Sequence, residues 1–130
     1  MIKRILLVDD EPDFHRLVRL LLESDDREIE SCYDGEECLK HVADRPPDLI
    51  IIDVMMPKLN GVEAVKRLKK MPGTENIPVI MVTALDNKEY VRAALFRLGV
   101  EYYIIKPFDS DDFVGKVNQA LHYYNTNSEE

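Results

Sequence analysis

Cysteine and long apolar runs are both scarce in this sequence, and their scarcity excludes whole classes of protein. The two cysteines, Cys32 and Cys38, are too few for a disulfide framework, and no second pair supplies metal-ligand spacing. We therefore expect both to be reduced and buried. The first apolar run, Ile5–Val8, ends at Asp9. It is too short for the core of a signal peptide or for a membrane span, so we expect a cytoplasmic protein.

Positive charge is also in short supply. The chain has 17 Lys+Arg against 25 Asp+Glu, a formal net charge of −8. Nucleic acid and anionic membranes repel such a chain unless it carries a local basic stripe. A basic cluster does occur near residues 66–70, but charge runs of this kind are usually solvated helix faces. We expect no direct binding to nucleic acid or membrane.

The 130 residues match the size of one domain, since domains commonly hold roughly 100–200 residues. We expect residues 1–124 to form it, followed by 125–130 as a polar, unstructured tail or the start of a linker. Short apolar runs alternate with segments of helical period, which predicts a doubly wound α/β domain with a parallel sheet covered on both faces. The expected strands are Ile5–Val8, Ile29–Tyr33, Leu49–Ile52, Val79–Val82 and Tyr102–Ile105.

Helix boundaries carry their own signals. Asp34, Asn60 and Asp86 each stand three positions before a glutamate, a pattern similar to a capping box. Gly99 stands where a left-handed residue commonly ends a helix. The histidines share no metal-ligand spacing, so we expect all of them at the surface. They are His15, His41 and His122.

Polar residues directly follow most of the expected strands. In an open parallel sheet, ligands bind beyond the carboxyl ends of the strands, so these residues would share one edge. They are Asp9 and Asp10, Asp53, Thr83 and Lys106. Carboxylates that lie close together need a compensating cation, and oxygen ligands without His or Cys favour Mg²⁺. Such a site suits phosphoryl transfer, with a carboxylate attacking phosphorus and Lys106 neutralising its oxygens.

This ordered set of motifs resembles the receiver domain of two-component response regulators. The resemblance covers residues 1–124 and rests on Asp9-Asp10, the segment Asp53 to Gly61 that includes Pro57, Thr83-Ala84, and Lys106-Pro107-Phe108. It implies a flavodoxin-like fold of the chemotaxis-regulator kind, with five parallel strands in the order 2-1-3-4-5. It also implies a Lys106-Pro107 bond that is commonly cis.

The resemblance implies a role for each residue at the strand ends. Asp53 would accept a phosphoryl group from a histidine kinase or phosphotransfer protein. Asp10, Asp53 and the backbone carbonyl of Met55 would bind Mg²⁺ directly, and Asp9 would act through a metal-bound water. Lys106 would pair with a phosphoryl oxygen.

A switch is implied as well. Thr83 would move to hydrogen-bond a phosphoryl oxygen, and Tyr103 would turn inward into the vacated space. A partner or output domain would read the change on the face of the fourth helix, fifth strand and fifth helix. Such a module assists only its own phosphorylation and dephosphorylation and is not an enzyme. A monomer and a phosphorylation-dependent dimer are both compatible with the resemblance.

Two residues depart from the pattern of fast receivers. Met55 and Leu85 stand two residues after Asp53 and Thr83, where faster self-hydrolysing receivers often carry groups that position water. Because neither side chain can orient an attacking water, we predict a long phosphoryl lifetime.

Two other functions would use residues of the same kind. A Mg²⁺-dependent phosphatase of the haloacid-dehalogenase type also uses an aspartate nucleophile beside a parallel sheet. It requires a second Asp two residues later, where this chain has Met55. A flavin-binding protein of the same topology needs a phosphate-binding loop after the first strand. The turn Asp9–Asp13 instead holds four acids and no glycine.

Overall fold

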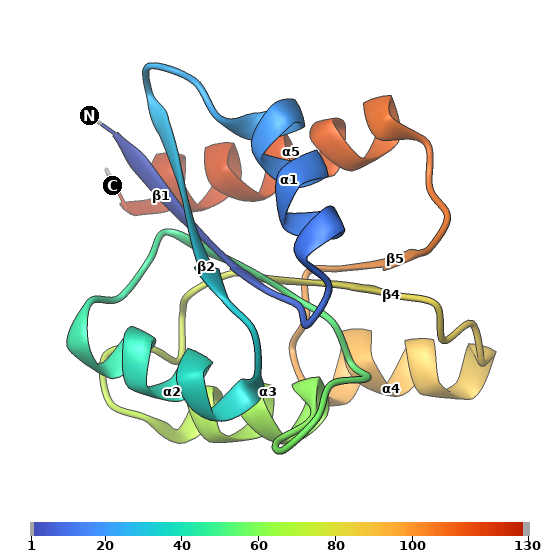
Figure 1. The fold of residues 1–130 in the computed structure, drawn as a ribbon. Helices are drawn as coiled ribbons and strands as arrows, with labels where there is room; N and C mark the ends of the chain where they lie inside the picture. Colours follow the sequence, from blue (N-terminus) through green and yellow to red (C-terminus); the bar gives the residue numbers. More distant parts are fainter. Residues whose placement is uncertain (1, 129–130) are drawn as a thin grey trace.

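The computed structural model describes residues 2–128 and the side chains of residues 2–122 (Figure 1). Strands and helices alternate along this part of the chain, as the apolar pattern predicts. In chain order they are β1 (Lys3–Val8), α1 (Pro12–Leu22), β2 (Arg27–Cys32), α2 (Gly35–Asp44), β3 (Leu49–Ile52), α3 (Gly61–Lys70), β4 (Val79–Thr83), α4 (Lys88–Arg97), β5 (Tyr102–Ile105) and α5 (Ser110–Ser128).

The five strands form one parallel sheet in the order β2-β1-β3-β4-β5, which confirms the expected topology. Helices α1 and α5 cover one face, and α2, α3 and α4 cover the other (Figure 1). In the register of β1 with β3, Val8 aligns with Ile52. The next residues of the two strands, Asp9 and Asp53, therefore emerge side by side at the carboxyl edge of the sheet.

Two apolar layers hold the helices to the sheet, because successive side chains of a strand point to opposite faces. On β1, Ile5 and Leu7 pack in the layer beneath α1 and α5, whereas Leu6 and Val8 pack in the layer beneath α2, α3 and α4. All four side chains are fully buried, and each contributes about 1.5–3 kcal/mol of hydrophobic stabilisation. The buried strand β1 thus fixes the position of Asp9, the residue that follows it.

Helix starts follow the capping signals at two positions and depart from them at a third. Asp34 and Asn60 each accept a hydrogen bond from the backbone N–H three residues later. The prediction for α4 is wrong by one residue. Asn87, not Asp86, accepts from the backbone N–H of Tyr90, because α4 begins at the residue after Asn87.

Helix ends are also partly as expected. Gly99 follows α4 with a φ of +73°, as predicted. The expectation of an unstructured segment from residue 125 is wrong for 125–128, because α5 continues to Ser128. A helix already begun gains a hydrogen bond with each added residue, and no glycine or proline lies between 116 and 128 to stop it. Residues 129–130 lie outside the described part of the chain. No described helix has the length and apolarity needed to cross a membrane.

Candidate functional site

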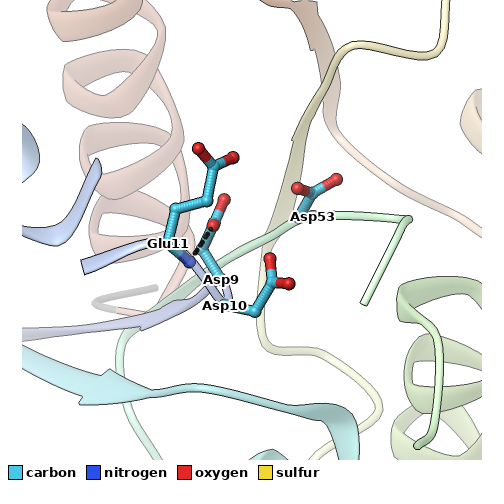
Figure 2. A group of neighbouring side chains, drawn as sticks. All are labelled: Asp9, Asp10, Glu11 and Asp53. Atoms are coloured by element: carbon cyan, nitrogen blue, oxygen red, sulfur yellow. Dashed lines mark hydrogen bonds between the residues drawn. The ribbon is translucent and has the colours of Figure 1, made fainter. Parts of the chain in front are cut away.

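Four carboxylates converge at the carboxyl edge of the sheet (Figure 2). Asp9, Asp10 and Glu11 follow β1, and Asp53 follows β3. One oxygen of each lies within 4.8 Å of the others. Asp9 is fully buried and Asp53 is 7% exposed, whereas Asp10 and Glu11 are exposed. The cluster therefore has a buried side and a side that solvent can reach.

Backbone N–H groups orient the two buried carboxylates. The N–H of Glu11 donates to Asp9 Oδ1 at 2.9 Å, and the N–H of Met55 donates to Asp53 Oδ1 at 3.1 Å. In both cases the donor lies two residues after the aspartate, which is the local turn that Asp side chains commonly form. One oxygen of each carboxylate is thereby held, and Oδ2 remains for cations.

Lys106 supplies the cation of the site from the end of β5. Its Nζ lies 2.9 Å from Asp9 Oδ2 and 3.6 Å from both Asp53 Oδ2 and Glu11 Oε1. The same nitrogen lies 4.1 Å from the centre of the Phe14 ring, a cation–π contact. Partial burial acts to lower the pKa of Lys106, but the hydrogen bond to Asp9 and the nearby carboxylate charges outweigh it and raise the pKa.

Asp9 experiences opposing electrostatic effects from burial and from its hydrogen-bond donors. Burial raises the pKa of Asp9, while the hydrogen bonds from Lys106 and from the Glu11 N–H act to lower it; the net direction is upward. The charge of Asp53 adds to the increase. One ammonium among several carboxylates leaves negative charge in excess, so the site attracts a further cation.

The donor set fits a divalent cation such as Mg²⁺. All four ligand atoms of the cluster are carboxylate oxygens, with no His or Cys among them. Mg²⁺ prefers such hard donors and keeps several waters. The exposed carboxylates of Asp10 and Glu11 lie where those waters can reach.

Gly61 allows α3 to begin directly against the loop that holds Asp53. Its N–H donates to the carbonyl of Val54 at 2.9 Å. A Cβ placed on Gly61 would lie 2.1 Å from the carbonyl oxygen of Asp53. Because no side chain fits such a contact, glycine is required for this approach of helix and loop.

The two expected switch residues, Thr83 and Tyr103, both hydrogen-bond to the backbone of one loop residue, Leu85. The Leu85 N–H donates to the buried Thr83 Oγ1 at 3.4 Å, and the Tyr103 hydroxyl donates to the Leu85 carbonyl at 2.7 Å. Burial, together with the neighbouring Tyr90 and the charge of Asp53, raises the pKa of Tyr103 to about 12. The hydroxyl therefore keeps the hydrogen that it donates.

His15 is not at the surface, so the expectation for this residue is wrong. It is 3% exposed, with Nε2 2.7 Å from the carbonyl oxygen of Asp9 and Nδ1 2.8 Å from Ser31 Oγ. A polar ring can be buried here because both nitrogens have partners. His41 is half-buried beside Glu30 at 3.0 Å.

Asp9, Asp10, Asp53 and Lys106 lie together, as their positions after the strands predict. The sequence pattern did not predict three further contributors, which come from the start of α1 or the turn before it: Glu11, Phe14 and His15. Each had a signal. Glu11 continues the acidic run, Phe14 lies on the apolar stripe of the helix, and His15 stands three residues before an apolar position of that stripe.

The family model and the similar proteins all describe response regulators. Residues 5–118 match the family model of the response regulator receiver domain. The chain is 37% identical over 121 residues to the alkaline phosphatase synthesis transcriptional regulatory protein PhoP of Bacillus subtilis. It is 34% identical over 121 residues to the phosphate regulon transcriptional regulatory protein PhoB of Rhizobium meliloti. Both alignments cover 93% of this chain but 49% and 53% of the relatives, so the chain spans about half their length.

Solved structures share the fold. A putative response regulator from Chloroflexus aurantiacus superposes with a TM-score of 0.86 at 30% identity, covering 94% of this chain and 99% of that one. A CheY-like response regulator receiver domain protein from Methanospirillum hungatei superposes with a TM-score of 0.88 at 26% identity, covering 98% and 99%. These matches confirm the flavodoxin-like topology with five parallel strands.

Proposed function

Because this chain belongs to the response regulator receiver domain family, as a receiver of two-component signalling, we propose that Asp53 is its phosphoacceptor. One observation carries this assignment: Asp53 Oδ2 lies 3.6 Å from Lys106 Nζ inside the carboxylate cluster. The other oxygen of Asp53 is held by the Met55 N–H, which fixes the direction in which Oδ2 points. The proposed nucleophile Asp53 thus lies next to both the Lys106 ammonium and the carboxylates that could bind a metal ion.

The proposed reaction moves a phosphoryl group from a histidine kinase or phosphotransfer protein to Asp53. An oxygen of Asp53 forms a bond to phosphorus while the bond from phosphorus to the donor's histidine nitrogen breaks, and that nitrogen keeps the electron pair. The product is an aspartyl-phosphate. Lys106 neutralises charge on the phosphoryl oxygens as the group transfers.

Receiver domains use Mg²⁺, and we propose a specific ligand set in this chain. Asp10, Asp53 and the backbone carbonyl of Met55 would hold the ion directly, and Asp9 would hold it through a water. Glu11 is a further carboxylate of the same cluster. Bound Mg²⁺ supplies positive charge that offsets the phosphoryl oxygens and lets an anionic donor approach an acidic site.

We assign the switch to Thr83 and Tyr103. A Thr83 hydroxyl that turned to a phosphoryl oxygen would give up the Leu85 N–H, and Leu85 also holds the Tyr103 hydroxyl. The loop before α4 would then be free to move. This supports the α4–β5–α5 face as the surface that changes, where Phe96 is already 81% exposed.

Receiver domains of this family interact with histidine kinases and output domains. For this chain we propose a kinase or phosphotransfer protein as phosphodonor, and a partner or output domain at the α4–β5–α5 face. The domain, residues 1–124, would act in the cytoplasm as a monomer or a phosphorylation-dependent dimer, turning over no external substrate. PhoP and PhoB are transcriptional regulatory proteins, so a regulator built on this receiver would control transcription through a segment other than the acidic receiver.

The phosphatase alternative is not favoured, because the family match is to receivers. The side chain of Met55 is apolar and 64% exposed and offers no carboxylate beside Asp53. The test is intact mass after incubation with Mg²⁺ and phosphoramidate, comparing wild type with Asp53→Asn. A single phosphoryl gain that requires Asp53 supports the assignment. Steady release of phosphate from an external ester would support the phosphatase instead.

A further inference from the structure

His15 is a buried histidine in contact with the acidic turn. Its ring packs against the Tyr33 ring, with the ring centres 4.4 Å apart and the planes tilted by 30°. One nitrogen meets the backbone carbonyl of Asp9 at 2.7 Å, and the other meets Ser31 Oγ at 2.8 Å. The ring therefore connects α1 and β2 to the first residue of the carboxylate cluster.

The partners of the ring decide where its hydrogen lies. A carbonyl oxygen only accepts, so Nε2 carries the hydrogen that reaches Asp9. Ser31 Oγ already accepts a hydrogen bond from the Arg19 guanidinium at 2.8 Å. Its own hydrogen is therefore available to Nδ1 of His15. In this arrangement every polar atom of the network has a partner.

The Asp9 carbonyl belongs to the peptide unit between Asp9 and Asp10. Because a peptide unit is planar, holding its carbonyl restrains the plane that contains the Cα atoms of both aspartates, from which their side chains leave the backbone. The Asp9 N–H is also held, by the carbonyl of Cys32 at 3.1 Å. Both backbone groups of Asp9 are thus tied to β2, one directly and one through His15.

We propose that His15 is a positioning residue for the metal site: its Nε2 hydrogen bond to the Asp9 carbonyl holds the turn Asp9–Glu11 in the conformation that binds Mg²⁺. This inference rests on the proposed function, because it assigns the acidic turn to Mg²⁺. Groups that orient a metal's ligands without touching the metal commonly change metal affinity by about 10- to 100-fold when removed. His15 acts on the turn in that way.

Substitutions of His15 can distinguish the effect of its hydrogen bond to Asp9 from the effect of the ring's volume. The amide nitrogen of His15→Gln reaches about as far as Nε2 and can still donate to Asp9. The shorter His15→Asn reaches only the position of Nδ1, and His15→Met fills volume without a donor. His41→Asn is the matched control, because His41 also lies in a helix but contacts Glu30, away from the acidic turn.

The experiment is calorimetric titration of the folded full chain with Mg²⁺ alone. We expect His15→Asn and His15→Met to raise the Kd about tenfold, while His15→Gln and His41→Asn stay within about threefold of wild type. Phosphorylation by phosphoramidate should recover in the weak binders at saturating Mg²⁺, because the nucleophile is untouched. The conservative Gln rescue is a result that a merely structural role would not give.

Several results would overturn the proposal. They are an unchanged Kd in His15→Asn and His15→Met, a Kd in His15→Gln as weak as in His15→Asn, or an equal loss in His41→Asn. If neither His15→Asn nor His15→Met folds while His15→Gln does, the bond serves stability rather than the metal, and the proposal fails. Failure of the proposed function itself looks different: wild type would bind Mg²⁺ but gain no phosphoryl group, and the comparison of affinities would still decide the role of His15.

Discussion

The Nζ of Lys106 lies 2.9 Å from Oδ2 of Asp9, although 97 positions separate the two residues in the chain. The contact joins the end of β5 to the end of β1, across the strands that lie between them in the sheet. Asp9 is buried and Lys106 is mostly buried, so neither charge would be stable there alone. The ion pair therefore forms only when β1 and β5 occupy their places in the folded sheet.

The first prediction concerns Lys106. Replacing Lys106 by Met keeps most of the side-chain volume but removes the cation from the carboxylate cluster. We expect phosphorylation of Asp53 by phosphoramidate to slow about a hundredfold, since one lost charge-stabilising group commonly costs 10²–10³ in rate. Mg²⁺ affinity should not weaken, because the substitution removes a competing positive charge. A variant that is phosphorylated at the wild-type rate would contradict the role of Lys106.

A second prediction concerns the lifetime of the phosphoryl group. The side chains of Met55 and Leu85 cannot orient water, so we expect slow loss of phosphate from the wild type. The double variant Met55→Asn, Leu85→Glu should lose phosphate at least about tenfold faster, because a side chain able to assist proton transfer contributes typically 10²–10⁴-fold. Decay followed by ³¹P NMR tests this, and equal lifetimes in both proteins would count against it.

A third prediction compares two glycines. A Cβ on Gly61 would lie 2.1 Å from the Asp53 carbonyl oxygen, whereas a Cβ on Gly115 meets nothing within 4 Å. We expect Gly61→Ala to lower the free energy of unfolding by about 2 kcal/mol or more, because backbone must shift. Gly115→Ala in α5 should raise it by about 0.5–1 kcal/mol. Urea unfolding measures both, and equal effects of the two substitutions would show that the close approach is unimportant.

A fourth prediction concerns pH and lies far from the metal site. Burial acts to raise the pKa of Glu30, but hydrogen bonds from Arg4 and His41 outweigh it, and the pKa falls below its usual value of 4.5. A carboxyl with a lowered folded-state pKa stabilises the fold above its unfolded-state pKa and loses that contribution as the pH falls through the folded-state pKa.

The test compares wild type with Glu30→Gln in urea unfolding at several pH values. Wild type should be the more stable near neutral pH, and the difference should shrink as the pH falls below about 4.5. The amide cannot titrate, so Glu30→Gln serves as its own control for the acid dependence. A difference in stability that stays constant down to strongly acidic pH would show that the Glu30 pKa is not lowered.

The strands and the site were predictable for the same reason. Continuous apolar runs specify buried parallel strands, and parallel strands place the residues after them at one edge. The sequence alone therefore predicts that Asp9, Asp53 and Lys106 lie together. His15 could not be placed in this way. Its burial depends on Ser31 of β2, on Tyr33 just after that strand and on the backbone carbonyl of Asp9. Backbone partners leave no trace in side-chain spacing.

The cap of α4 and the end of α5 show a different limit. Asp86 and Asn87 are both good capping residues, and their order in the sequence does not decide which one adopts the capping backbone. Tertiary context chooses Asn87. At the other end, the polar composition of 125–128 indicated a tail, whereas α5 continues through this segment. Composition alone does not tell where a helix already begun will stop.

The central claim is that Asp53 carries the phosphoryl group. Borohydride reduces an aspartyl-phosphate to homoserine, so the modified position can be read by tandem mass spectrometry of peptides. The account predicts homoserine at residue 53, formed only when Mg²⁺ and phosphoramidate are both supplied. Homoserine at Asp9 or Asp10 instead, or no conversion in folded protein that binds Mg²⁺ and has gained a phosphoryl group, would contradict it.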